Sequence, residues 1–273
     1  MIIDAHTHTY PETIAKRAIE KLEKNSGTKA HTNGVQSGLM ASMKEAGISY
    51  SLLLPVATSK KQVDTINEVA AETNAKALET GLLSFGGIHP ETENVSEVLN
   101  RIKALKGIKI HPDYQGTFFN DIRYKRIVEK ATELGLYITV HAGVDIGMPD
   151  PVHCTPNHVL EVLKDTESDH LILAHMGGWR LWNEVKEKLM EKPLYFDTSF
   201  SGDYLQKEGV SGMLTKEAFV DLIHAMGSDR VLFGTDSPWS GQKDAVQWFM
   251  ETDLTETEKK KILSDNFIRI IGI

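Results

Sequence analysis

Histidines that follow short apolar runs are the residues of this 273-residue chain whose type and spacing could do chemistry. One residue separates His6 from His8 near the start of the chain. His141 and His175 each end a later apolar run. Asp236 ends another such run. Neutral imidazole nitrogens and carboxylate oxygens are common ligands of divalent metals such as zinc. The pattern therefore predicts a metal centre built from segments that are distant in the chain.

These residues need a scaffold that brings the ends of several segments together. Eight short apolar runs alternate with longer segments of helical period, which is the pattern of repeated βα units. The expected strands are 1–8, 50–56, 82–88, 107–111, 136–141, 170–175, 194–198 and 230–236. The expected helices are 11–24 with 35–46, 62–80, 95–105, 121–134, 156–164, 181–190 and 216–226, followed by closing helices in 255–273.

The regular repeat favours a (β/α)8 barrel, also called a TIM barrel. No break in composition and no Pro-, Gly- or Ser-rich linker divides the chain, so we expect residues 1–273 to form a single domain. An open, doubly wound sheet is the alternative. It is disfavoured because no glycine-rich dinucleotide-binding motif follows the first strand. The polar stretch 202–211 is expected to form a loop over the barrel mouth.

Active sites of such barrels lie at the carboxyl ends of the strands. Side chains of a strand alternate between its two faces, so His6 and His8 should project together into the barrel. On the sixth expected strand, Ile172 and Ala174 should face outward under the helices, which leaves His175 inward. The same reasoning turns the residues that end the fifth and eighth expected strands, His141 and Asp236, inward.

The fourth expected strand adds a buried amine to the site. Ile108 and Ile110 should cover its outer face, so Lys109 and His111 point into the barrel. An ammonium group is repelled by a nearby dication. Lys109 must therefore be neutral, carbamylated into an anionic metal bridge, or turned toward an anionic substrate.

Composition restricts the kinds of binding partner and the cellular compartment that we expect. A formal net charge of −8 argues against nucleic acids and anionic membrane surfaces, because both need clustered Lys and Arg. Cys154 is the sole cysteine, which excludes an internal disulfide and favours a reducing compartment. With no secretory signal and no apolar run long enough to cross a bilayer, we expect a cytoplasmic protein that acts on a small molecule, and a homo-oligomer is compatible with the sequence.

Five motifs, each at the end of an expected strand, resemble those of the amidohydrolase superfamily. The resemblance is strongest to the amidohydrolase-related branch that contains aminocarboxymuconate semialdehyde decarboxylase, and it covers the whole chain. The motifs are Asp-Ala-His-Thr-His at 4–8, Gly-Ile-Lys-Ile-His-Pro at 107–112, Val-His-Ala-Gly at 140–143, Ala-His-Met-Gly-Gly at 174–178 and Phe-Gly-Thr-Asp-Ser-Pro at 233–238.

The resemblance implies a ligand set and a mechanism. It makes Asp236 a metal ligand that also moves protons, together with the ligands His6, His8 and His141. His175 would bind a second metal or, with one metal, orient or activate the attacking water. Lys109 matches a position that some two-metal members carbamylate. We expect one or two divalent ions, first of all Zn2+, with Mn2+, Fe2+ or Co2+ as alternatives.

Hydrolysis is the expected reaction, with a metal-bound water attacking the carbonyl of an amide, ester or lactone. Asp236 would take the proton of that water and return it to the leaving group. Non-oxidative decarboxylation of an unsaturated or aromatic acid is the alternative, since it needs the same ligands. A non-catalytic metal-binding protein is a third reading, disfavoured by the complete ligand set.

Residues next to the strand ends are expected to shape the substrate pocket. Each of them has an ordinary packing or loop-fixing role as its alternative. Asp4 is expected to be structural or to orient a metal-bound imidazole. The pocket candidates are His89, His111, Trp179, Arg180 and Trp239.

Overall fold

The apolar runs form parallel strands that close into a (β/α)8 barrel in the computed structural model, which describes residues 1–272. One group of paired strands has the order β1-β2-β3, and the other runs from β4 to β9 in chain order. Every pairing is parallel. The strands are β1 Ile3–Thr7, β2 Tyr50–Leu53, β3 Leu82–Ser84, β4 Gly86–Gly87, β5 Gly107–Ile110, β6 Tyr137–Val140, β7 Leu171–Leu173, β8 Tyr195–Asp197 and β9 Val231–Leu232.

Two seams join these groups into a closed barrel. Strands β3 and β4 are consecutive parts of one barrel strand, interrupted at Phe85. At the other seam, the segment after β9 pairs with β1. The Ala5 N–H donates to the Phe233 carbonyl at 2.7 Å, and the Asp236 N–H donates to the His6 carbonyl at 2.8 Å. The first and last strands of the chain therefore lie side by side.

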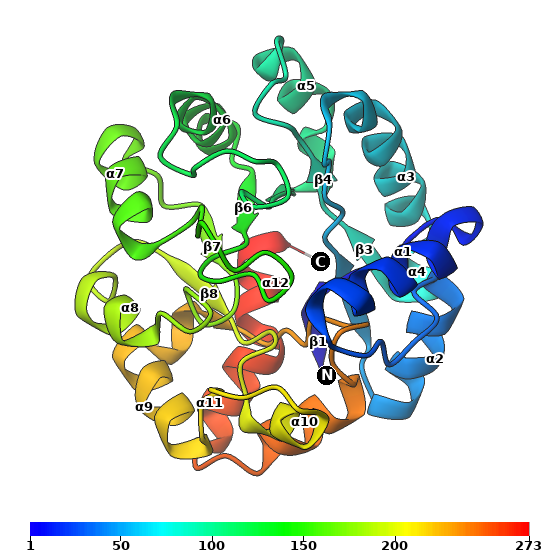
Figure 1. Ribbon diagram of the computed structural model, residues 1–273, viewed down its shortest axis with the longest axis vertical. Helices are drawn as coiled ribbons and strands as arrows, with labels where there is room; N and C mark the ends of the chain where they lie inside the picture. The colour runs from blue at the N-terminus through cyan, green and yellow to red at the C-terminus, as the bar shows by residue number, and fades with distance from the viewer. Residues whose placement is uncertain (273) are drawn as a thin grey trace.

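Helices surround the strands in a ring, as Figure 1 shows. Helix α1 is an exception, because its C-terminal turn lies over the barrel mouth, where Leu22, Asn25 and Ser26 line a pocket. The α-helices are α1 Glu12–Ser26, α2 Gln36–Ala46, α3 Val63–Ala75, α4 Ala77–Thr80, α5 Val95–Arg101, α6 Ile122–Glu133, α7 Pro156–Thr166, α8 Trp182–Lys188, α9 Lys216–Met226, α10 Gln242–Met250, α11 Glu256–Lys260 and α12 Asn266–Ile271.

Side chains from strands around the barrel meet in its interior. This inner cluster contains Ile3 and Ala5 of β1, Leu232 of β9, and two residues of α12 below them, Phe267 and Ile271. A larger cluster fills the layer between strands and helices and includes Ile108, Ile110, Ile138 and Val140. Those four isoleucine and valine side chains face outward, as the sequence predicted.

The predicted direction of Ile172 is wrong. Ile172 packs in the inner cluster, whereas Leu171 and Leu173 pack in the outer layer. Strict alternation would then turn His175 outward. The chain leaves the extended conformation at this point, with φ of +58° at His175, and this brings the imidazole to the site.

The first strand also departs from strict alternation. Ile3 and Ala5 face the interior, and the register of β1 against β2 is irregular between Asp4 and Thr7. Because Ile3 and Ala5 face inward, strict alternation would turn His6 outward. The irregular register lets the His6 side chain reach the site instead. His6 and His8 lie close together, as the sequence predicted, but the strand reaches this arrangement through an irregular register and not through regular alternation.

Helix α10 was not predicted, and the predicted closing segment divides into α11, a π-helical turn over Lys261–Asp265, and α12. Residue 273 of that segment lies outside the described residues. Within residues 1–272, none of the helices combines the length and apolar character required to cross a membrane.

Candidate metal centre

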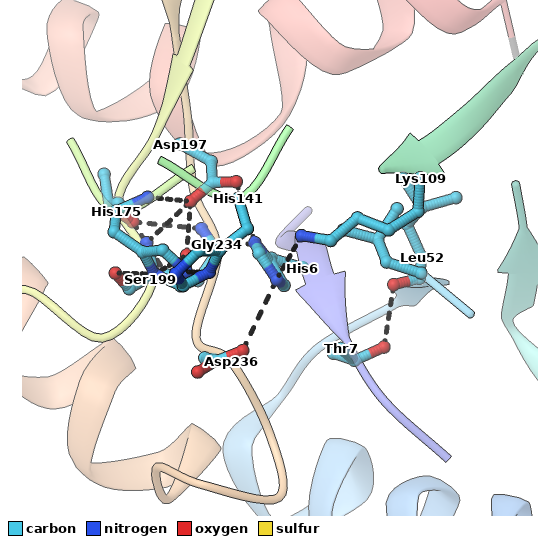
Figure 2. Close-up of polar contacts among 12 residues, drawn as sticks. His6, Thr7, Leu52, Lys109, His141, His175, Asp197, Ser199, Gly234 and Asp236 are labelled. Carbon is cyan, nitrogen blue, oxygen red and sulfur yellow. Dashed lines mark hydrogen bonds and ion pairs between the residues drawn. The ribbon is translucent and has the colours of Figure 1, made fainter. Parts of the chain in front are cut away.

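Three potential ligands meet at the seam between the first and last strands. His6 Nε2 lies 3.2 Å from His8 Nε2 and 3.4 Å from Asp236 Oδ1. His8 Nε2 lies 3.1 Å from the same carboxylate oxygen. All three donor atoms lie within 4.8 Å of one another, the separation expected of ligands that share one ion. Figure 2 shows His6 and Asp236 facing each other.

The hydrogen bonds of the two Nδ1 atoms determine which nitrogen of His6 and of His8 carries the proton. His6 Nδ1 lies 2.8 Å from Asp197 Oδ2, and His8 Nδ1 lies 3.0 Å from the Leu54 carbonyl oxygen. Both partners accept hydrogen bonds, so each Nδ1 carries the proton and each Nε2 presents a lone pair. Two lone pairs and a carboxylate oxygen therefore converge on one point. A divalent cation bound at this point would satisfy all three donor atoms, so the residues fit a divalent metal.

Lys109 places an amine beside this set. Its Nζ lies 3.2 Å from His6 Nε2, and the residue is only 1% exposed. Burial lowers the pKa of Lys109 to about 8, although the carboxylates of Asp197 and Asp236 oppose the shift. The amine therefore sits between neutral and charged near physiological pH, and Figure 2 shows it reaching toward His6 from β5.

Burial and the charge of Lys109 also act on the ligands. Together they lower the pKa of His6 to about 3, so its imidazole is neutral. Burial alone would raise the pKa of Asp236. The polar contact with His8 and the charge interactions with the neighbouring imidazoles outweigh burial and lower that pKa to about 2. A neutral imidazole beside an ionised carboxylate is the state in which these residues bind a cation.

Asp197, and not Asp4, orients a metal-facing imidazole. Asp197 ends β8, is fully buried and accepts from His6 Nδ1. The Asp4 side chain does not contact the imidazole and accepts from the His6 backbone N–H at 3.2 Å, the Thr235 N–H at 2.9 Å, the Thr235 hydroxyl at 2.6 Å and Gln242 Nε2 at 2.7 Å. The structural alternative predicted for Asp4 describes these contacts, which tie β1 to α10.

His141 and His175 form a neighbouring pair of imidazoles. His141 Nδ1 lies 3.0 Å from His175 Nε2, and the other nitrogen of His141 faces Asp145 Oδ2 at 4.0 Å. His141 shares a second group of potential ligands with His111 and Asp145. The structure thus brings His141 to the site but groups it apart from the first three ligands.

The site opens into a pocket with about 880 Å³ of empty volume, part of it open to solvent. Three of the predicted pocket residues, His111, Trp179 and Trp239, line it. Arg180 instead stacks its guanidinium 4.2 Å from the Trp179 ring centroid and donates to the Ser211 carbonyl. His89 Nδ1 accepts from the Glu91 N–H at 3.2 Å, which is the loop-fixing role that was its alternative.

Several residues of the site were missed by sequence reasoning. Tyr10, Tyr114 and Asp145 line the pocket from loops, and no spacing signal distinguishes them. Asp197 could have been found, because it is an acidic residue at the end of the seventh barrel strand. Ser199, whose hydroxyl lies 3.0 Å from His6 Nδ1, follows it by two positions.

A family model described as Amidohydrolase matches residues 3–273 of this chain. The chain is 32% identical over 103 residues to a gamma-resorcylate decarboxylase of Polaromonas sp., and 28% identical over 115 residues to one of Rhizobium sp.. The first match covers 34% of this chain and 31% of that enzyme, and the second covers 38% and 34%. The matched segments thus span about a third of these relatives.

Solved structures resemble the chain over its whole length. A 2,6-dihydroxybenzoate decarboxylase complexed with 2,6-dihydroxybenzoate has a TM-score of 0.73 at 17% identity and covers 100% of this chain and 99% of its own. A dihydroxybenzoic acid decarboxylase of Polaromonas sp., with bound manganese and 2-nitroresorcinol, has a TM-score of 0.67 at 17% identity over 99% and 96% of the two chains. At this identity the likeness shows the fold alone.

The prediction of hydrolysis is wrong. The curated relatives that match this sequence are decarboxylases, which break a carbon–carbon bond and do not add water to a carbonyl. The ligand residues could not reveal this, because the same imidazoles and carboxylate serve either reaction. The predicted resemblance to the amidohydrolase superfamily is confirmed by the family model, and the expected reaction is corrected.

Proposed function

We propose that this chain is a metal-dependent decarboxylase of an aromatic or unsaturated carboxylic acid. The proposal starts from the family, because the chain belongs to the amidohydrolase family. The observation that carries the proposal is the 32% identity, over 103 residues, to a gamma-resorcylate decarboxylase. The pocket supports it further. Its walls include Trp179, Phe200, Trp239 and Tyr10, which suit a flat, apolar substrate body.

His6, His8 and Asp236 hold the metal in this proposal. A divalent cation bound there supplies a Lewis acid that draws electron density from a substrate oxygen. The relative with bound manganese favours Mn2+, and two imidazoles with one carboxylate also suit Zn2+, Fe2+ or Co2+. The site residues prepare this binding themselves, because Asp197 and the Leu54 carbonyl fix the two imidazoles in the tautomer with free Nε2 atoms.

Lys109 orients the substrate acid in this proposal. Its amine is buried at the floor of the pocket, and a substrate carboxylate that enters would stabilise the charged form. A carbamate at Lys109 is the alternative. It would replace this positive charge with a negative one and repel an anionic substrate, so decarboxylation favours the free amine.

Asp236, which is ionised at rest, would relay the proton that the reaction consumes, taking it from solvent water that enters the pocket and passing it to the substrate carbon. Loss of carbon dioxide leaves an electron pair on the substrate carbon, and a proton must be added there. The Asp236 side chain borders the pocket beside His8, within reach of a substrate held at this floor. His175 also lines the pocket. Its Nδ1 is held by Ser199, which fixes the direction of its ring.

Carbon dioxide release tests the proposal. The full-length protein, loaded with Mn2+ and separately with Zn2+, would be assayed on aromatic and unsaturated acids and on the matching amides and esters. We expect carbon dioxide from at least one acid and no cleavage of the amides or esters. Asp236→Asn should lower kcat by about 10²–10⁴-fold with the fold retained.

Two results would contradict the proposal. One is hydrolysis of the amides or esters without carbon dioxide from any acid. The other is decarboxylation that survives unchanged in Asp236→Asn with normal metal content. Circular dichroism of the variant separates a loss of chemistry from a loss of folding.

A further inference from the structure

We propose that His111 and Asp145 form a subsite for a hydroxyl group of the substrate on the pocket wall, an assignment that rests on the aromatic-acid decarboxylation proposed above. His111 follows β5, and Asp145 lies in the loop after β6. Both side chains line the pocket, and the residues are only 5% and 6% exposed. Polar groups withdrawn from water in this way are stabilised when a bound molecule completes their hydrogen bonds.

The contacts of His111 Nδ1 make the other ring nitrogen a donor. Nδ1 accepts from the Tyr114 N–H at 3.4 Å, so it is unprotonated. Asp113 Oδ2, at 3.9 Å, is too distant to form a hydrogen bond with Nδ1. The imidazole therefore carries its proton on Nε2, which lies 3.5 Å from Asp145 Oδ2.

This separation leaves room for an atom of the substrate. N–H···O hydrogen bonds in proteins span about 2.7–3.2 Å, so a donor and an acceptor that are 3.5 Å apart do not satisfy each other. A hydroxyl oxygen about 2.9 Å from His111 Nε2 and about 2.7 Å from Asp145 Oδ2 would accept from the first and donate to the second. A methyl group there could do neither.

Neighbouring contacts hold both groups in place before a substrate binds. The His111 ring is stacked between those of Tyr114 and His141, with centroids 3.9 and 4.0 Å away and planes 7° and 9° apart. Asp145 Oδ1 accepts from the Gly147 N–H at 2.9 Å, which leaves Oδ2 for the substrate. Groups that are already ordered lose little entropy on binding, so they can discriminate strongly between substituents.

The place of this subsite selects the position and the kind of substituent. Lys109 lies within β5 at the pocket floor, whereas His111 follows that strand and lies closer to the barrel mouth. An acid group at Lys109 therefore directs the far side of the aromatic ring toward His111 and Asp145. The Asp145 carboxylate would accept from a hydroxyl there and repel a second acid group. The substrate class is thus an aromatic acid with a hydroxyl group meta or para to its carboxylate.

Binding of substituted benzoates tests the subsite separately from turnover. The full-length protein, loaded with Mn2+, would be titrated calorimetrically with benzoate and with its meta- and para-hydroxy, methyl and carboxy derivatives. A methyl group is close to a hydroxyl in size but forms no hydrogen bonds. We expect at least one hydroxybenzoate to bind about 10–100-fold more tightly than its methyl counterpart, and the dicarboxylates to bind more weakly than benzoate.

Two substitutions should change these preferences differently. Asp145→Asn should abolish the preference for hydroxyl over methyl and also let the dicarboxylates bind better, because the repelling charge is gone. His111→Phe keeps a flat ring in the stack but has no donor, so it should weaken the hydroxyl preference only. Asp113→Asn is the matched control. That buried carboxylate lies near His111 but is bound by His153, so both preferences should remain.

Four results would overturn the subsite. The wild type could bind no benzoate, or bind hydroxy- and methylbenzoates equally. The hydroxyl preference could survive in both variants. Elemental analysis could show that Asp145→Asn and His111→Phe lose bound metal, which would make the change in affinity a consequence of the metal centre. If a variant fails to fold, a crystal structure of the wild type with the tightest hydroxybenzoate decides. A hydroxyl oxygen within about 3.2 Å of His111 Nε2 and Asp145 Oδ2 supports the subsite, and a hydroxyl placed elsewhere overturns it.

Carbon dioxide release from the same acids separates this subsite from the proposed function. Decarboxylation with no hydroxyl preference overturns the subsite alone. A hydroxyl preference that both variants lose, in a protein that releases no carbon dioxide, supports the subsite and contradicts the proposed reaction.

Discussion

His6 presents a free Nε2 because of the contacts of its Nδ1 atom, of which Asp197 is the nearest and the Ser199 hydroxyl, at 3.0 Å, the second. Its Nδ1 donates to Asp197 at 2.8 Å, and both residues are 1% exposed or less. We predict that Asp197→Asn weakens metal binding about 10–100-fold, because a neutral amide is a poorer acceptor and can present its own N–H groups to the ring. Competition with a coloured chelator measures the affinity. An unchanged affinity would show that Asp197 does not orient His6 for binding.

Asp4→Asn is the control for this change, since it also neutralises a fully buried carboxylate on a barrel strand. Asp4 contacts Thr235 and Gln242 rather than a metal-facing ring. We expect this variant to lower the free energy of unfolding by about 1–3 kcal/mol, because buried donors lose their acceptor, with metal affinity nearly unchanged. Equal losses of affinity in both variants would mean that buried charge in general, and not the contact with His6, controls binding.

At the scale of elements, the ends of the barrel strands were predictable from the sequence. Apolar runs that stop at His141, Lys109 with His111, and Asp236 give the strand and the side-chain direction together, because outward positions must be apolar to pack under helices. The fold follows from repeating this pattern. Helix α10 escaped prediction because the polar residues at its start mask its apolar face.

Local backbone geometry was not predictable in the same way. His175 and Asp236 adopt φ of +58° and +71°, a conformation that non-glycine residues rarely take and that no periodicity reveals. The pairing of His141 with Asp145 and His175 could not be foreseen either. Alternation along a strand shows which face a histidine occupies, but the atoms around it determine which ring nitrogen carries the proton.

Close packing between β1 and the segment after β9 is an element-scale requirement of the site. A Cβ atom added at Gly234 would lie 2.9 Å from the Cβ atom of His6, which cannot move without shifting its strand. We predict that Gly234→Ala displaces His6, lowers metal affinity by at least about 10-fold and reduces turnover accordingly, since a ligand shifted by an ångström no longer binds well. Isothermal titration with Mn2+ measures the affinity.

Gly135→Ala separates this effect from general destabilisation. Gly135 lies between α6 and β6 with φ of +68°, and an added Cβ there meets nothing within 4 Å. It should cost about 1 kcal/mol of stability through backbone strain and leave metal affinity intact. If both alanine variants lose affinity equally, the contact between Gly234 and His6 does not position the ligand.

For the whole molecule, the proposed metal ligands connect the first and last strands of the barrel. His6 lies in β1, His8 follows that strand, and Asp236 follows β9, so a cation bound there would tie the first barrel strand to the last across the seam that closes the barrel. Without the cation, the lone pairs of His6 and His8 face an ionised Asp236 carboxylate in a buried setting. Metal removal should therefore loosen this seam first and lower the stability of the whole barrel with it.

We predict that saturating metal raises the free energy of unfolding by about 2.7 kcal/mol at a free concentration 100 times Kd, which corresponds to a rise in Tm of roughly 5–10 °C. Calorimetry of the apo and metal-loaded protein measures the shift. Hydrogen exchange should slow most at the Ala5 and Asp236 amides, whose hydrogen bonds cross the seam. The double variant His8→Asn, Asp236→Asn should lose most of the shift. A full shift in that variant, or protection gained elsewhere first, would mean that the stabilising ion does not bind at this seam.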